Sequence, residues 1–176
     1  MRDKVLVVDD DEDAVSLMSV ALMQEGYICD GTFSATEALA LLRKNVEHQY
    51  RLVLTDIMMP VMDGIELIEQ IQRQFSGVGI IVLSAEKNMK LAIDSMRKGA
   101  LDYVTKPYQF ELVLPRIKKA IERVRLEREN REYQQFLEEK IENRTAALIE
   151  KHRSLQKLFI NTVEAIARAI EAKDPY

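Results

Sequence analysis

Short apolar runs alternate with amphipathic segments through the N-terminal part of the chain. Three runs are continuous and rich in β-branched residues, namely Val5–Val8, Leu52–Leu54 and Ile80–Leu83. Such runs are typical of strands that are buried on both faces of a parallel sheet. Two weaker candidates, Tyr27–Thr32 and Leu101–Thr105, bring the expected number of strands to five.

Helical spacing fills the segments between these runs. Apolar residues recur at separations of three and four from Ala14 to Leu22, and Ser34–Glu37 has the pattern of a capping box. Further helices are expected after Asp63-Gly64, over Asn88–Lys98 and from near Tyr108. Strands that alternate with helices predict an α/β fold with right-handed crossovers and a doubly wound parallel sheet. Ligands bind such sheets beyond the carboxyl ends of the strands.

The pattern changes after Phe110, where glycine disappears and Glu, Lys, Arg, Leu, Ile and Ala dominate. This composition is typical of a long helix. Two apolar rows follow, Ile117, Ile121 and Val124, then Leu137, Ile141, Leu148, Leu155 and Leu158. The second row has heptad-like spacing, with Arg144 and Lys151 at two of its positions. The rows are out of register, so we expect a stutter or a break near residues 128–135.

Charge divides the chain in the same way. Residues 1–109 carry 11 basic and 17 acidic side chains, and residues 110–176 carry 14 and 12. This asymmetry indicates two units with different roles. The basic residues between Arg116 and Arg131 alternate with glutamates, which favours a salt-bridged helix over a DNA contact. With a net charge of −4 as well, we expect no nucleic-acid partner.

Few features suggest secretion or a membrane. Cys29 is the single cysteine, which points to a reducing compartment. The sequence has no recognisable signal peptide and no apolar stretch near the ~20 residues that a span requires. We therefore expect a soluble, cytoplasmic protein without a membrane partner.

Polar side chains follow four of the predicted strands. They are Asp9, Asp10 and Asp11 after the first strand, Asp56 after the third, Ser84 after the fourth and Lys106 after the fifth. Clustered carboxylates repel one another unless a cation lies among them, and Mg²⁺ suits oxygen ligands. With Mg²⁺ bound, Asp56 would attack phosphorus while Lys106 neutralises the phosphoryl oxygens and Ser84 donates a hydrogen bond.

These motifs resemble the receiver domains of bacterial two-component response regulators. The residues that carry the resemblance are Val7–Asp10, Asp56–Gly64, Ser84-Ala85 and Lys106-Pro107. The match covers roughly residues 3–122, and it implies the flavodoxin-like receiver fold with five parallel strands. It also implies a phosphorelay in which Asp56 accepts a phosphoryl group from a sensor histidine kinase or a phosphotransfer protein.

The resemblance assigns roles to the remaining site residues. Asp10, Asp56 and the backbone carbonyl of Met58 would bind Mg²⁺ directly, and Asp9 would contribute through water. Asp11 is left as a residue that starts a helix. Met58 is also expected to tune the lifetime of the phosphorylated form, because its side chain is a poor hydrogen-bond partner for an attacking water.

Four further residues receive roles in the same way. Ser84 and Tyr103 would form the switch pair, although Tyr103 as plain core packing is an open alternative. Glu86 would flank the phosphoryl group and tune its lifetime together with Met58. Lys106 would precede a cis peptide bond to Pro107.

The C-terminal part has two further resemblances. Segments such as Leu137–Thr145 resemble the coiled linkers of bacterial signalling proteins, so a coiled-coil linker that pairs with its copy in a homodimer is expected over residues 123–158. Residues 161–176 resemble the opening helix of HD-GYP domains, which hydrolyse cyclic di-GMP, so the start of such a domain is expected at residues 159–176. The His-Asp pair and the Gly-Tyr-Pro motif of those domains are absent. We therefore expect a non-enzymatic switch that contains only the start of a truncated output domain, with the catalytic part missing from this chain.

Two other interpretations were weighed. A phosphatase of the haloacid-dehalogenase type also uses an aspartate, a hydroxyl, a lysine and Mg²⁺. Its nucleophile follows the first strand in an Asp-x-Asp-x-Thr or Val context, which Asp9–Asp13 lacks. A scaffold that dimerises without being phosphorylated would be expected to have lost an acid or the lysine.

Overall fold

The computed structural model describes residues 2–44, 50–85, 89–107 and 109–171. It divides into two compact units, residues 1–129 and 130–176, which are described separately below. The finer division into 3–122, 123–158 and 159–176 stays a prediction.

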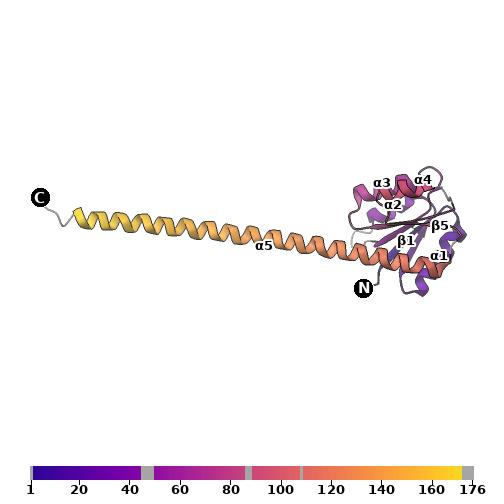
Figure 1. Cartoon of the computed structure of the whole chain (residues 1–176), viewed down its shortest axis with the longest axis horizontal. Helices are drawn as coiled ribbons and strands as arrows, with labels where there is room; N and C mark the ends of the chain where they lie inside the picture. Colours follow the sequence, from indigo (N-terminus) through magenta and orange to yellow (C-terminus); the bar gives the residue numbers. More distant parts are fainter. Residues whose placement is uncertain (1, 45–49, 86–88, 108, 172–176) are drawn as a thin grey trace. The chain divides into compact units, whose positions relative to one another are not determined.

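Strands and helices alternate strictly in the first unit (Figure 1). The strands are β1 (Lys4–Val8), β2 (Ile28–Thr32), β3 (Leu52–Thr55), β4 (Gly79–Ser84) and β5 (Asp102–Thr105). The helices are α1 (Glu12–Gln24), α2 (Ala35–Lys44), α3 (Gly64–Gln74), α4 (Met89–Arg97) and α5 (Phe110–Glu171). The two weaker strand predictions are thus confirmed as β2 and β5.

All five strands are parallel and follow the order β2-β1-β3-β4-β5. The predicted doubly wound parallel fold is therefore confirmed. Because β1 pairs with β2 on one side and β3 on the other, the chain reverses its direction of winding between β1 and β3. In folds of this kind, ligands bind beyond the carboxyl ends of the strands at such a reversal, which here lies at the ends of β1 and β3.

Alternate residues of each buried strand pack into two separate cores. Leu6 and Val8 of β1 join the core beneath α2 and α3, whereas Val5 and Val7 join the core beneath α1 and the first turns of α5. Figure 1 shows the same division, with α2, α3 and α4 on one side of the sheet and α1 and α5 on the other. Both faces are covered, which explains why β1, β3 and β4 are continuous apolar runs.

Side-chain caps fix where two helices begin. The Asp11 carboxylate accepts hydrogen bonds from the backbone N–H groups of Asp13 and Ala14 at the start of α1. Asp63 caps α3 in the same way. The prediction that Asp11 starts a helix is thereby confirmed, and its side chain is committed to that cap.

The predicted capping box of α2 forms only in part. The hydroxyl of Ser34 accepts a hydrogen bond from the backbone N–H of Glu37, as the pattern predicts. The Glu37 carboxylate, however, accepts a hydrogen bond from the Thr32 hydroxyl at 2.6 Å. A partner from the end of β2 thus takes the place of the local one.

Helix α5 continues through residues 128–135 without interruption. Of the two expectations for this segment, the break is therefore wrong and the stutter stays a prediction. In the second unit the described structure is the part of α5 from residue 130 to 171. Within the described residues, no helix combines the length and the hydropathy that crossing a membrane would need.

Candidate functional site

Three carboxylates meet where β1 and β3 end. Ligand oxygens of Asp9, Asp10 and Asp56 all lie within 4.8 Å of one another. The backbone N–H of Asp56 donates to the Val8 carbonyl at 2.9 Å, which extends the ladder between β1 and β3 past the last paired residues. Sheet hydrogen bonding therefore fixes the backbone that carries these acids.

Lys106 supplies the positive charge of this site. Its Nζ lies 2.5 Å from Oδ2 of Asp9 and 3.6 Å from Oδ2 of Asp56. Its backbone N–H donates to the carbonyl of Ser84 at 2.7 Å, which holds the end of β5 against the end of β4. The peptide bond from Lys106 to Pro107 is cis, as the resemblance implied.

Burial controls the electrostatics of Asp9. Its side chain is 6% exposed, and this desolvation raises the pKa of the carboxyl above the ordinary value of an aspartate. The hydrogen bond and the charge of Lys106 oppose that rise. Lys106 therefore offsets part of the rise in pKa that burial causes at Asp9.

The loop after Asp56 closes tightly on itself. Gly64 donates its N–H to the carbonyl of Ile57 at 2.9 Å. A Cβ at Gly64 would lie only 2.1 Å from the carbonyl oxygen of Asp56 and 2.8 Å from Cα of Ile57. Only glycine permits this approach. Gly64 was predicted only as the residue before a helix and as the end of the Asp56–Gly64 motif, and its close approach to the backbone of Asp56 was not predicted.

The predicted switch residues lie on neighbouring strands. Ser84 is fully buried at the end of β4 and pairs with Thr105 of β5. Tyr103 is half-buried on β5, opposite Val82, and packs against the core beneath α2 and α3. Val82 belongs to the same core, so alternation along the strand directs Ser84 and Tyr103 to the same face of the sheet.

The two predicted tuning residues have different outcomes. Met58 lies two residues after Asp56 and is 64% exposed, and its tuning role stays a prediction. Glu86 lies outside the described residues.

The geometry defines a class of site. Oxygen donors from Asp9, Asp10 and Asp56 are the ligand type that Mg²⁺ prefers, and their close spacing fits a single ion. A lysine beside them neutralises anionic oxygens. Such a site at the switch point of a parallel α/β domain has the ligands to hold a divalent cation and a lysine to approach an anionic group.

Comparison with known proteins identifies the family. Residues 5–118 match the response regulator receiver domain family. The chain therefore belongs to this family, whose members act in two-component signalling, interact with histidine kinases or phosphotransfer proteins, and generally bind Mg²⁺ through acidic residues.

Curated relatives resemble this chain over the same region. The DNA-binding transcriptional regulator NtrC of Proteus hauseri is 32% identical over 120 residues, which are 68% of this chain and 25% of the relative. The transcriptional regulatory protein ResD of Bacillus subtilis is 36% identical over 120 residues, or 68% and 48% of the two chains. The chain thus spans a quarter to a half of these relatives.

Solved structures of receiver domains also resemble this chain. A CheY-like receiver domain protein from Methanospirillum hungatei is 28% identical, with a TM-score of 0.67 over 72% of this chain and 99% of the other. The receiver domain of an HD domain-containing protein from Pseudomonas fluorescens is 28% identical, with a TM-score of 0.68 over 73% and 93%. Both confirm the receiver fold.

The expectation of no nucleic-acid partner is weakened by these relatives. NtrC is named as DNA-binding, and ResD is named as a transcriptional regulator.

Within α5 itself, the predicted salt bridges are present, because Arg123 pairs with Glu127 at 2.9 Å and Arg125 pairs with Glu122 at 2.8 Å. The basic stretch is thus interleaved with acids in space as well as in sequence.

The close approach of Gly64 to the backbone of Asp56 predicts that a larger residue at this position destabilises the fold. Gly64→Ala should lower the free energy of unfolding by about 1–3 kcal/mol, because the new methyl group meets backbone atoms that have no rotamer to change. The matched control is Gly79→Ala, whose Cβ would meet the side-chain ends of Val124, Leu101 and Leu52 at 2.8–3.1 Å. Urea denaturation should give the larger loss for Gly64→Ala, and an equal or smaller loss would contradict the assignment.

Proposed function

We propose that this chain is the phosphorylated switch of a phosphorelay, with Asp56 as the phosphoryl acceptor. The observation that carries the proposal is Lys106, whose ammonium lies 2.5 Å from Asp9 and 3.6 Å from Asp56 within the acid cluster. A carboxylate oxygen of Asp56 attacks phosphorus, and the bond from phosphorus to the donor histidine nitrogen breaks. The electron pair leaves with the histidine, and Lys106 neutralises charge on the transferred group.

The residues proposed to hold Mg²⁺ are Asp10, Asp56 and the backbone carbonyl of Met58, with Asp9 acting through water. When bound, the ion supplies positive charge to the phosphoryl oxygens and offsets the repulsion among the acids. Ser84 donates a hydrogen bond to the phosphoryl group, and Tyr103 responds to that movement as the switch residue. The common face of these two residues supports the pairing.

The phosphodonor is a sensor histidine kinase or a phosphotransfer protein, and the chain itself catalyses no turnover of an external substrate. A haloacid-dehalogenase-type phosphatase is disfavoured by its motif. In that class the nucleophile follows the first strand in an Asp-x-Asp-x-Thr or Val context, and Asp9–Asp13 after β1 lacks that Thr or Val.

The output of the switch is proposed to pass through α5. Two copies pair through the heptad row of residues 137–158 as a coiled coil, and phosphorylation changes that pairing. The similarity of residues 161–176 to the opening helix of HD-GYP domains favours a cyclic di-GMP phosphodiesterase as the output, and the HD domain-containing neighbour from Pseudomonas fluorescens supports it. Transcriptional control is the second candidate, because NtrC and ResD are transcriptional regulators.

The acceptor role has a direct test. With Mg²⁺ and acetyl phosphate, the chain should incorporate close to one phosphoryl group, detected as an acid-stable, base-labile mass increase. Asp56→Asn should abolish it, because an amide is no nucleophile at phosphorus. Asp13→Asn removes an exposed carboxylate four residues from Asp9 and should label normally. Labelling that survives in Asp56→Asn would refute the proposal.

Met58 has a second test. An exposed thioether two residues after Asp56 orients an attacking water poorly, so Met58→Asn should speed hydrolysis of the phosphorylated form by roughly tenfold, the factor that one orienting hydrogen bond of about 1.4 kcal/mol would bring. Loss of the phosphorylated mass after removal of the donor gives the rate. Met23→Asn, at a half-exposed methionine of α1, should decay like the parent. Equal decay of Met58→Asn and the parent would remove the tuning role.

The output class is tested with the product of the whole gene. That product should hydrolyse cyclic di-GMP, at a rate that changes on phosphorylation by acetyl phosphate. Catalysis absent in both states, together with specific binding to promoter DNA, would instead favour the transcriptional candidate.

A further inference from the structure

The second unit is a helix with an uncovered apolar surface. From residue 130 to 169, its large apolar side chains are 38–70% exposed. They are Tyr133, Phe136, Leu137, Ile141, Leu148, Ile149, Leu155, Leu158, Phe159, Ile160, Val163 and Ile166. Most helical stability in proteins comes from packing an apolar face, so this segment requires a partner.

The spacing of one row identifies the geometry of that partner. Leu137, Ile141, Arg144, Leu148, Lys151, Leu155 and Leu158, here called the seam, are separated by four and three residues in strict alternation. This is the heptad spacing of two helices that supercoil around each other. A second copy of the chain supplies an identical row in register, and we take it as the occupant.

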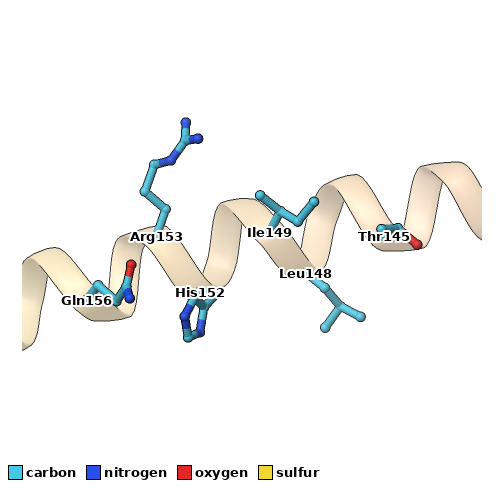
Figure 2. Close-up of a pocket in the computed structure, with 6 residues that line it drawn as sticks. All are labelled: Thr145, Leu148, Ile149, His152, Arg153 and Gln156. Atoms are coloured by element: carbon cyan, nitrogen blue, oxygen red, sulfur yellow. The ribbon is translucent and has the colours of Figure 1, made fainter.

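Figure 2 shows which side chains share the seam's side of the helix. Leu148 and His152 point to one side, whereas Ile149 and Arg153 point to another. Arg153 is therefore a cation outside the seam, although it lies only two residues after the seam cation Lys151.

The seam contains two cations where a coiled coil requires apolar residues. In a parallel, in-register pair, Arg144 faces its own copy, and Lys151 does the same one heptad later. Like charges that approach each other away from water repel, and a desolvated ammonium or guanidinium costs free energy. The leucine and isoleucine layers on both sides favour pairing, so the seam combines opposing contributions.

We propose that Arg144 and Lys151 form a built-in weak point that holds self-association of α5 close to its threshold. This inference rests on the proposed function, since it assumes that α5 pairs with a second copy. It adds the regulation of that pairing, because a dimer near its threshold responds to a small bias from the receiver, whereas an all-leucine seam would stay paired in every state.

The first experiment measures the dimer dissociation constant of the full chain by analytical ultracentrifugation. Arg144→Leu combined with Lys151→Leu should tighten the dimer by at least about tenfold, the factor that one additional buried leucine layer would bring. The matched control, Arg153→Leu combined with Lys157→Leu, removes the same charge outside the seam and should not tighten it. Equal tightening by both pairs, or no change with the seam pair, would overturn the proposal.

Salt provides a second measurement. Between about 0.15 M and about 1 M sodium chloride the screening length falls from about 8 Å to about 3 Å. The parent dimer should tighten over this range more than the seam double variant, because only the parent has like charges facing each other. A salt response that is the same in both would contradict facing cations.

A charge reversal separates this proposal from the pairing on which it rests. A tagged Arg144→Glu, Lys151→Glu chain should recover the parent chain in preference to itself, because each acid then faces a cation in the parallel register. If the parent alone is monomeric while the mixture or the leucine variant dimerises, the weakening effect of Arg144 and Lys151 is supported. The proposal that the parent chain dimerises by itself is then refuted. If none of these chains associates, the seam itself is wrong.

Discussion

Repulsion among three carboxylates is the constraint on which the receiver site depends. Asp9, Asp10 and Asp56 bring ligand oxygens within 4.8 Å of one another, where each pair of charges repels by a few kcal/mol at the dielectric of a protein surface. The sheet holds them there, because β1 and β3 are neighbours and their residues pack into cores on both faces. Burial of apolar strands thus supplies the free energy that keeps the acids together, and Lys106 offsets part of the repulsion.

Patterns that depend on local physics were predictable from sequence. β1, β3 and β4 are buried on both faces, so each is a continuous apolar run. β2 and β5 have more mixed exposure, and their patterns were correspondingly weaker. The capping box of α2 was only half right, because Glu37 found a partner in Thr32, which belongs to another element.

For residues far apart in sequence, we could predict that they lie at the same edge of the sheet but not which of them make contact. The order of the strands brings Asp9, Asp56 and Lys106 to one edge, but spacing in sequence does not say which acid the lysine approaches more closely. The structure puts it nearer to Asp9, whose deeper burial makes a compensating charge more favourable there. Gly64 escaped notice for a similar reason, because its role depends on a backbone contact that folding creates.

A balance between opposing interactions also bears on how phosphorylation at Asp56 could change the pairing of α5. Moving a two-state element from 1:99 to 99:1 takes about 5.5 kcal/mol, which is most of what one to three charge-assisted hydrogen bonds to a phosphoryl group can deliver at about 1.5–3 kcal/mol each. A helix pair that leucines favour and cations oppose lies close to balance, so a contribution of one or two charge-assisted hydrogen bonds is enough to shift it. In the proposed dimer, a weak seam would therefore let a stable receiver act as a switch.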